Sequence, residues 1–177
     1  MRGRWQVRPA GSVRRGSPWL VLRGETQEAV LWNGPVLELG RGALDRLGPD
    51  ILTDDPDLAE MVRRLRAVEP SREVGDALLD QRLVAGIGNV WRAEALYLAG
   101  VSPWRRLAEL TDDELEQVLR QAARAMRGGR RPRWVYGRAG LPCRRCATRI
   151  ETRRQGEGAR SAYWCPACQA GTGVVSA

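Results

Sequence analysis

Short apolar runs separated by turn residues characterise the first part of the chain. The runs are 19–22, 29–32 and 36–39. Gly24 and the Asn-Gly-Pro segment at 33–35 separate them, and runs bounded in this way predict short β-strands. Three or four such strands have open edges and little core, so they are too few for an independent sandwich. We therefore expect residues 1–45 to be the end of a larger β domain.

Helical periodicity begins after a linker rich in Gly and Asp at 41–54. Asp55 and Pro56 are typical of a helix start, with Asp as the N-cap and Pro at the first helical position. Apolar residues then recur every three or four positions, as they do on one face of a helix. Two further helices are predicted, over 73–80 and over 90–99.

A fourth helix is predicted to begin at a capping box. Thr111 and Glu114 have the spacing at which each side chain bonds the backbone amide of the other residue. An apolar stripe follows within 115–126, on one face of the expected helix. The segment 50–128 is therefore predicted to be a module of four helices. The Arg-rich segment 127–133 that follows is expected to be an exposed linker that contacts a phosphate backbone or is simply solvated.

Composition matters mainly through what it excludes. All 29 basic residues are Arg, since the 177 residues include neither Lys nor His. Without His, catalytic schemes of the Ser-His-Asp or Cys-His type and His-ligated metals are excluded. Without Lys, the α-amino group of Met1 is the only amine in the sequence that can form an imine.

The charge of the chain indicates the class of partner. The net charge is +8 and the pI is about 10.5. Such a balance favours polyanionic partners, nucleic acid first and an anionic membrane surface second, while a compositional preference for Arg is the alternative. No apolar segment reaches the ~18 residues of a membrane span, and the N-terminus lacks the apolar region of a signal peptide. We expect no membrane association and a cytoplasmic location, where cysteines bind metal more often than they form disulfides.

The four cysteines form two CxxC pairs, Cys143 with Cys146 and Cys165 with Cys168, separated by eighteen residues. This is the spacing of a four-thiolate zinc site, in which each tight CxxC turn supplies two sulfurs. Four protein ligands leave no position for water, so one structural zinc ion is expected; two disulfides or unpaired thiols are the alternatives. The segment 134–169 is too short to bury much core, and the metal is expected to supply much of its folding free energy.

A glycine turn precedes the third predicted helix. Gly86 and Gly88 permit a tight turn with exposed amides, and Asn89 can cap the helix behind it. Backbone amides beside a helix N-terminus form a phosphate site, although an ordinary packing corner between helices has the same pattern. Basic residues also lie between the two CxxC pairs, where a rigid hairpin suits contact with a nucleic-acid backbone or is merely solvated.

Two stretches together resemble one family of DNA-repair enzymes. The stretch 78–103, with GIGN at 86–89, resembles the helix-two-turn-helix domain of the formamidopyrimidine-DNA glycosylase/endonuclease VIII family, and 134–169 resembles its C-terminal zinc finger. The resemblance implies an α+β multidomain fold. Its parts are a truncated β-sandwich remnant of the catalytic domain at 1–45, a helix-two-turn-helix DNA-binding domain at 50–128 and a four-Cys zinc-finger β-hairpin at 134–169. The small and polar residues 170–177 that follow are expected to form a flexible tail.

The resemblance also implies roles for the matching residues. Asn89, in GIGN, matches the residue that binds the phosphates flanking a flipped nucleotide, with Gly86 and Gly88 shaping its turn. Arg160, five residues before Cys165, matches the finger residue that grips the same backbone. The implied partner is double-stranded DNA with a damaged base or an abasic site, bound by a monomer with one zinc ion.

The resemblance stops at the family's nucleophile. The family uses the amine of an N-terminal Pro, followed by Glu, and a Lys later in the β domain, whereas this sequence begins Met1-Arg2-Gly3 and has no Lys. The sequence therefore identifies no catalytic residue, and the activity of the chain as given stays open. It is expected to be part of a bifunctional DNA glycosylase/apurinic-apyrimidinic lyase, which removes damaged bases through an N-terminal imine. The alternatives are a catalytically silent DNA-binding module and a zinc-ribbon RNA-binding module.

Overall fold

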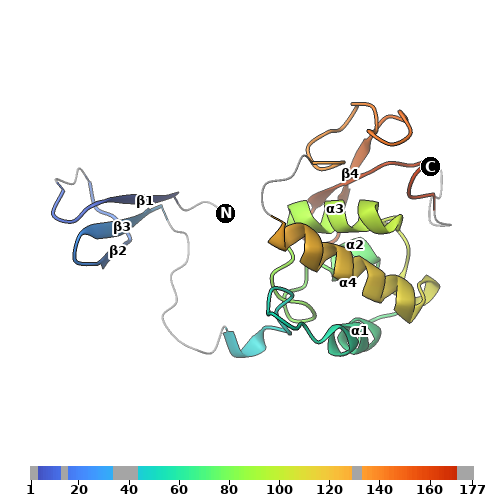
Figure 1. The fold of residues 1–177 in the computed structure, drawn as a ribbon, viewed down its shortest axis with the longest axis horizontal. Helices are drawn as coiled ribbons and strands as arrows, with labels where there is room; N and C mark the ends of the chain where they lie inside the picture. The colour runs from blue at the N-terminus through green and yellow to red at the C-terminus, as the bar shows by residue number, and fades with distance from the viewer. Residues whose placement is uncertain (1–3, 13–15, 34–43, 129–132, 171–177) are drawn as a thin grey trace. The chain divides into compact units, whose positions relative to one another are not determined.

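The computed structural model describes residues 4–12, 16–33, 44–128 and 133–170. The chain forms two compact units, Met1–Gly42 and Ala43–Ala177 (Figure 1). The strand expected at 36–39 lies outside the described residues, as do all but the first residue of the expected tail. None of the described helices combines the length and apolarity needed to cross a membrane.

The first unit contains a three-stranded antiparallel sheet with the strand order β1-β3-β2. The strands are β1 (Arg4–Pro9), β2 (Leu20–Arg23) and β3 (Gln27–Trp32). The runs at 19–22 and 29–32 are thereby confirmed as strands. Sequence reasoning did not single out β1, although Arg4-Trp5-Gln6-Val7 alternates polar and apolar residues as a half-buried strand does.

One face of this sheet is apolar. The register places Trp5 and Leu20 opposite Leu31, and Val7 and Leu22 opposite Ala29. Directly paired residues share a face, so these six side chains lie together. Three of them, Trp5, Val7 and Leu22, remain 52%, 65% and 54% exposed. On the other face Glu28 is buried against Arg8, with the Arg8 Nε 2.8 Å from its Oε1.

The second unit contains the four predicted helices and a small hairpin. The helices are α1 (Leu58–Arg66), α2 (Val74–Ala77), α3 (Asn89–Ala99) and α4 (Asp112–Arg127), with short 3-10 turns at Leu44–Arg46 and Leu107–Glu109. Helices α3 and α4 pack along each other (Figure 1). Their contact is part of a core in which Leu65, Leu96 and Leu119 are at most 1% exposed.

Two of the expected helix boundaries are wrong. The N-cap of α1 is Asp57 rather than Asp55, because the Asp57 carboxylate accepts the Glu60 amide at 2.8 Å, and Pro56 consequently precedes the helix. Helix α2 is a single turn, shorter than the expected 73–80, because the amides of Leu79 and Asp80 bond carbonyls three positions back instead of four, which ends the α-helical pattern.

The capping box of α4 is confirmed. The Glu114 amide donates to Thr111 Oγ1 at 3.2 Å, and the Thr111 amide donates to Glu114 Oε2 at 2.8 Å. Two otherwise unpaired amides at the start of the helix are satisfied in this way, which fixes where the helix begins.

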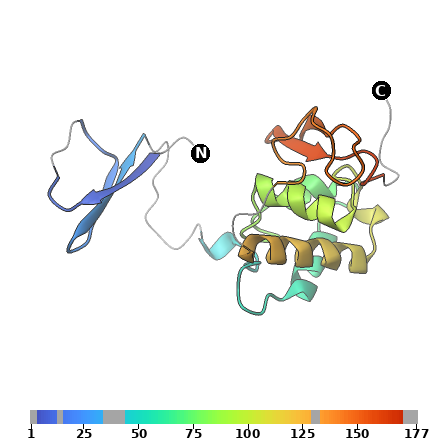
Figure 2. The same ribbon diagram turned by 45° about the horizontal axis from the view of Figure 1, so that its top comes forward.

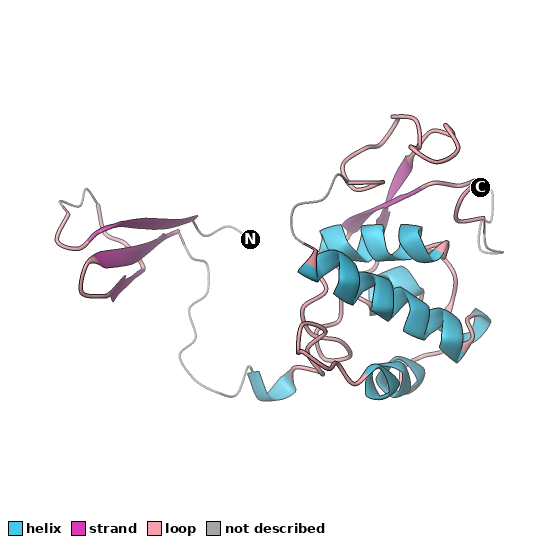
Figure 3. Cartoon of the chain, viewed as in Figure 1, coloured by secondary structure: helices cyan, strands magenta, loops and turns pink. Residues whose placement is uncertain are grey.

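The C-terminal segment is built mostly of loops around one antiparallel hairpin of β4 (Glu151–Gln155) and β5 (Arg160–Trp164) (Figure 3). Both views show α3 between α4 and this hairpin (Figures 1 and 2). Ala93 and Tyr97 of α3 form a second apolar cluster with Val135, Ile150 and two of the cysteines. The hairpin is therefore packed on the helices within one compact unit.

Candidate zinc centre and phosphate-binding niche

The four cysteine sulfurs converge as the sequence predicts, and all lie within 4.8 Å of one another. The Cys146 Sγ is 3.4 Å from both Cys165 Sγ and Cys168 Sγ, and the Cys143 Sγ is 3.9 Å from Cys168 Sγ. Tetrahedral zinc with bonds of about 2.3 Å requires sulfurs about 3.8 Å apart, so the donor set fits the ion. All four positions belong to protein thiolates, and the zinc is structural.

Each CxxC turn directs backbone amides at its own sulfurs. The Arg145 amide lies 3.4 Å from Cys143 Sγ, and the Cys168 amide lies 3.5 Å from Cys165 Sγ. Burial opposes ionisation of Cys143, but hydrogen bonds from Tyr97 and from backbone amides outweigh it and lower its pKa to about 6. Amides directed at sulfur stabilise the thiolate form that a metal requires.

The start of α3 forms the second candidate site. Gly88, with a φ of −100°, is the N-cap, so the expectation that Asn89 caps the helix is wrong. Asn89 is instead the first helical residue, and its Nδ2 donates to the Ser161 carbonyl on β5 at 3.2 Å. Its Oδ1 is buried and has no hydrogen-bond partner among the described residues. The side-chain amide of Asn89 thus bonds the zinc finger and does not cap its own helix.

The two glycines before Asn89 differ in what they do. Gly86 has a φ of +98°, a conformation that favours glycine, and its amide donates to Gln81 Oε1 at 2.8 Å. The amide at Gly86 is therefore engaged within the turn, contrary to the expectation that it is exposed. Gly88 has an open side, because a Cβ added there would have no atom within 4 Å. Gly86 shapes the turn, and Gly88 leaves space in front of the helix. This space, beside Gly88 and Asn89 at the start of α3, is called the α3 niche below.

The start of β5 is fastened to the start of α3. The Ser161 carbonyl accepts both the Asn89 amide group and the Arg92 Nη2, the latter at 2.9 Å. Arg160, the first residue of β5, is exposed and directly precedes this carbonyl. The fold thus brings Asn89 to the residue that follows Arg160, although Asn89 and Arg160 lie 71 positions apart in the sequence.

Arg92 is a buried cation that sequence reasoning missed. It is 1% exposed and also donates to Gly75 O at 3.2 Å and to Gln155 Oε1 at 3.3 Å. Its recorded acceptors are neutral, and in the described parts of the chain no carboxylate lies within ion-pair distance of it. Burial, together with the charge of Arg160, lowers its pKa to about 10. Arg92 therefore stays protonated near neutral pH and adds positive charge behind the niche.

Glu94, which sequence reasoning also missed, holds the chain where it enters the finger. Its carboxylate is buried and accepts three consecutive amides, those of Trp134, Val135 and Tyr136, at 2.8, 3.1 and 2.9 Å. A buried carboxylate needs such partners, because an unsatisfied charge in the interior is costly. No local signal reveals this role, since the partners lie 40 or more positions later.

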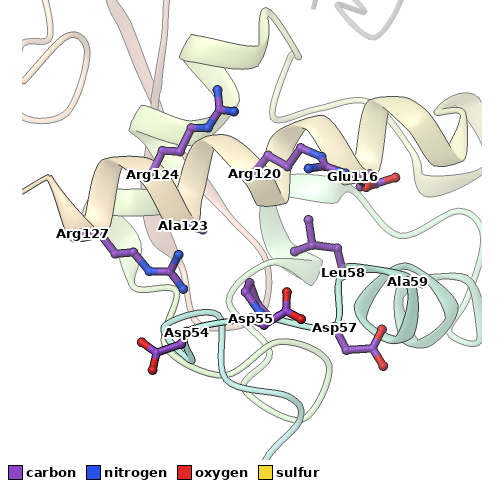
Figure 4. A pocket seen from close by; sticks show the side chains of 11 residues that line it. Asp54, Asp55, Asp57, Leu58, Ala59, Glu116, Arg120, Ala123, Arg124 and Arg127 are labelled. Carbon is purple, nitrogen blue, oxygen red and sulfur yellow. Dashed lines mark hydrogen bonds and ion pairs between the residues drawn. The ribbon is translucent and has the colours of Figure 1, made fainter.

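An open pocket of about 670 Å³ lies between the segment before α1 and the last turns of α4. Asp54, Asp55 and Asp57 are among the residues of one wall, and Glu116, Arg120, Arg124 and Arg127 of α4 are among those of the other (Figure 4). The first wall is acidic, and on the second wall three arginines outnumber the one carboxylate, that of Glu116. No residue of the zinc centre or of the α3 niche lines it.

Two family models match the chain in the order in which the motifs occur. "Formamidopyrimidine-DNA glycosylase H2TH domain" matches residues 47–131, and "Zinc finger found in FPG and IleRS" matches residues 140–171. "Probable endonuclease 8 2" of Streptomyces coelicolor is 39% identical, over 95% of this chain and 66% of the relative. "DNA-(apurinic or apyrimidinic site) lyase Nei2" of Mycolicibacterium smegmatis is 43% identical, over 72% of this chain and 54% of the relative.

Solved structures share the fold. The complex of Lactococcus lactis Fpg with DNA that contains an abasic site superposes with a TM-score of 0.76 over 97% of this chain and 73% of that one, at 19% identity. MutM bound to DNA that contains carbocyclic 8-oxo-G gives 0.76 over 97% and 72%, at 21% identity. The chain spans about two thirds of the first of the curated relatives above and about half of the second.

Proposed function

Because the chain belongs to the formamidopyrimidine-DNA glycosylase/endonuclease VIII family, we propose that it grips damaged duplex DNA for base-excision repair. The observation that carries this proposal is the joint between α3 and β5, where Asn89 and Arg92 both donate to the Ser161 carbonyl beside Arg160. The proposal is supported by three groups near this joint: a helix N-terminus, a side-chain amide and, one residue before the shared carbonyl, the exposed Arg160. All three favour phosphate oxygens.

Each group at the joint between α3 and β5 has a different role in the proposed binding of DNA phosphates. The first-turn amides of α3 offer donors and the positive end of the helix dipole. Asn89 Nδ2 supplies a side-chain donor, and Gly88 leaves room for a backbone to approach. Arg160 supplies the charge, and Gly86 shapes the turn. The partner is double-stranded DNA with a damaged base or an abasic site, bound by a monomer in the cytoplasm.

We assign the whole protein the activity of a bifunctional DNA glycosylase/apurinic-apyrimidinic lyase. Such chemistry requires an amine that attacks C1′ of the flipped nucleotide to form an imine. Within these 177 residues Met1 has the only amine, since no Lys is present. We therefore propose that this polypeptide binds an abasic duplex but processes it poorly, so that binding and chemistry separate.

Binding is tested by titrating an abasic duplex at several salt concentrations. If about 4–6 phosphates are neutralised, log K against log salt falls with a slope of about −4 to −5. Asn89→Ala weakens binding by about 1–3 kcal/mol, and Arg160→Ala does likewise while reducing the slope by about one. Arg63→Ala on α1, where the side chain is 70% exposed, is the matched control for loss of one charge. A flat salt dependence, or equal effects of Arg160→Ala and Arg63→Ala, contradicts the proposal.

Two further measurements separate the alternatives. Competition between duplex DNA and transfer RNA distinguishes DNA repair from a zinc-ribbon RNA-binding module. Borohydride treatment on an abasic duplex reports the chemistry, because only an imine is captured as a covalent adduct. Efficient capture by this polypeptide would assign the nucleophile's role to the Met1 amine and make the chain a complete lyase.

A further inference from the structure

Tyr97 reaches the zinc centre from outside the finger. Its hydroxyl oxygen is 3.2 Å from Cys143 Sγ, and its side chain is fully buried. All four sulfur ligands come from the segment after α4, whereas Tyr97 lies in the last turns of α3. The hydroxyl is therefore a contact that the helical part of the unit makes with the ligand set.

The direction of this hydrogen bond follows from coordination chemistry. A cysteine bound to zinc has lost its proton, so its sulfur only accepts. The tyrosine hydroxyl keeps its proton and donates. A donor at a metal-bound thiolate withdraws negative charge from the sulfur, which makes it less reactive and holds it in place.

The ring of Tyr97 is held so that the hydroxyl stays aimed at the sulfur. Trp134 stacks on it with ring centroids 5.7 Å apart and an interplanar angle of 22°. The Arg145 guanidinium lies 4.8 Å from the ring centroid, and Arg145 belongs to the same CxxC turn as Cys143. Two residues from the metal-binding segment thus pack against the Tyr97 ring of α3.

We propose that Tyr97 is a positioning residue of the zinc centre. Its hydroxyl donates to the zinc-bound thiolate of Cys143, slows release of the ion and fastens the finger to α3. The same helix carries Asn89 eight positions earlier, about 12 Å along its axis. One helix therefore supports the metal centre at one end and the α3 niche at the other.

The first test is Tyr97→Phe in the full zinc-loaded chain, which removes one oxygen and keeps the ring. Transfer of zinc to 4-(2-pyridylazo)resorcinol is expected to be about 10-fold faster than from the wild type, at the lower end of effects seen for groups that bond metal ligands. Tyr163→Phe is the matched control, because Tyr163 packs against Tyr136 and has no recorded hydroxyl hydrogen bond in the described part of the chain. Equal release rates in all three proteins would overturn the proposal.

Spectroscopy distinguishes a hydrogen bond from Tyr97 to the Cys143 sulfur from a role of Tyr97 in packing alone. In cobalt-substituted protein the thiolate-to-metal charge-transfer band should move to lower energy in Tyr97→Phe and stay in place in Tyr163→Phe. If Tyr97→Phe does not fold, the wild type loaded with an NMR-active cadmium isotope still decides. Its Tyr97 hydroxyl proton should exchange slowly and couple to the metal, and a freely exchanging proton would refute the hydrogen bond. None of these measurements involves DNA, so they do not depend on the proposed function.

Discussion

The two compact units differ in how far their apolar side chains are buried. In the sheet, Trp5, Val7 and Leu22 lie on one face and are more than half exposed. In the helical unit, Leu96 and Leu119 are at most 1% exposed. In the described part of the first unit no second layer covers the apolar face of the sheet, whereas two packed layers enclose a core. The second unit therefore meets the requirements of a folded domain, whereas the sheet alone does not.

Helix α3 explains how the second unit achieves this. Six of its eleven residues are buried, Arg92 to Tyr97 without a break, so it is enclosed nearly all round instead of having one apolar stripe. Leu96 faces the helical core, and Tyr97 faces the finger. The finger thus acts as a third layer that covers one face of α3.

The largest expected effect is loss of that layer. Cys143→Ser removes one of four zinc ligands, so the segment 134–169 should unfold while the helices stay folded, because their core contains no finger residue. Metal analysis should find about one zinc per wild-type chain and much less in the variant. Limited proteolysis should cut the variant only within this segment. Wild-type protein without metal and with all four thiols paired as disulfides would contradict the claim.

The next effect tests how closely the finger fits the helices. An added Cβ at Gly75 would lie 2.4 Å from Gln155 Oε1 and 2.9 Å from the Pro103 carbonyl. Gly75→Ala should therefore lower the free energy of unfolding by about 1–2 kcal/mol, net of the gain in helix propensity. Chemical denaturation measures this change.

Gly88→Ala is the matched control for that substitution. Nothing lies within 4 Å of the added carbon, and a φ of −100° suits any residue, so the only expected loss of stability is that of Ala at an N-cap, about 0.5 kcal/mol. Because the new methyl group would occupy the space in front of α3, DNA binding should weaken instead. Equal losses of stability in the two variants would mean that the finger does not press on Gly75.

The sequence predicted those parts of the molecule whose causes are local. The zinc ligands lie in pairs three positions apart, and the capping box of α4 spans four residues, so their geometry is encoded within one turn. The prediction that Asp55 is the N-cap of α1 is wrong because Asp55 and Asp57 both fit the local pattern. Only the observed hydrogen bond from the Glu60 amide to Asp57 distinguishes them.

The residues that sequence reasoning missed are buried by segments that lie far away in the sequence. Arg92 and Glu94 resemble solvent-facing positions of a helix, and they are buried only because segments 40 to 69 positions later cover them. The same distance hides the joint between Asn89 and Ser161, which lie 72 positions apart. A pattern read along one helix contains no information on which layer will later pack on it.

A third prediction concerns the turn between α2 and α3. Asp80 accepts Arg82 Nη2 at 2.7 Å and Arg72 Nη1 at 3.2 Å, and the hydrogen bonds from Arg82, more than any other interaction, hold its pKa far below the usual range. Because the folded state lowers this pKa, the stabilisation is present above the unfolded value of about 3.9 and is lost as the pH falls below it. Asp80→Asn should cost about 1–2 kcal/mol at neutral pH and progressively less toward pH ~2.

Denaturation of this variant at several pH values measures the difference from the wild type. Glu157→Gln serves as the control, since Glu157 is exposed and has no ion-pair partner recorded within the described residues. As a surface substitution it should leave the free energy of unfolding within about 0.5 kcal/mol of the wild type. A constant penalty for Asp80→Asn across the same range would show that the carboxylate acts through packing instead of charge.

The smallest effect is expected in the sheet, where Val7→Thr exchanges one methyl group for a hydroxyl. The Val7 side chain is 65% exposed, so the hydroxyl stays hydrated and the strand keeps a β-branched residue; the free energy of unfolding should change by less than about 0.5 kcal/mol. Leu96→Ala in α3 should cost about 2–5 kcal/mol by contrast, because the side chain is 1% exposed and leaves a cavity. Both values come from denaturant titrations at two protein concentrations. A loss above about 1 kcal/mol for Val7→Thr would mean that the apolar face of the sheet is covered in solution. A loss that depends on protein concentration would mean that a second molecule covers it.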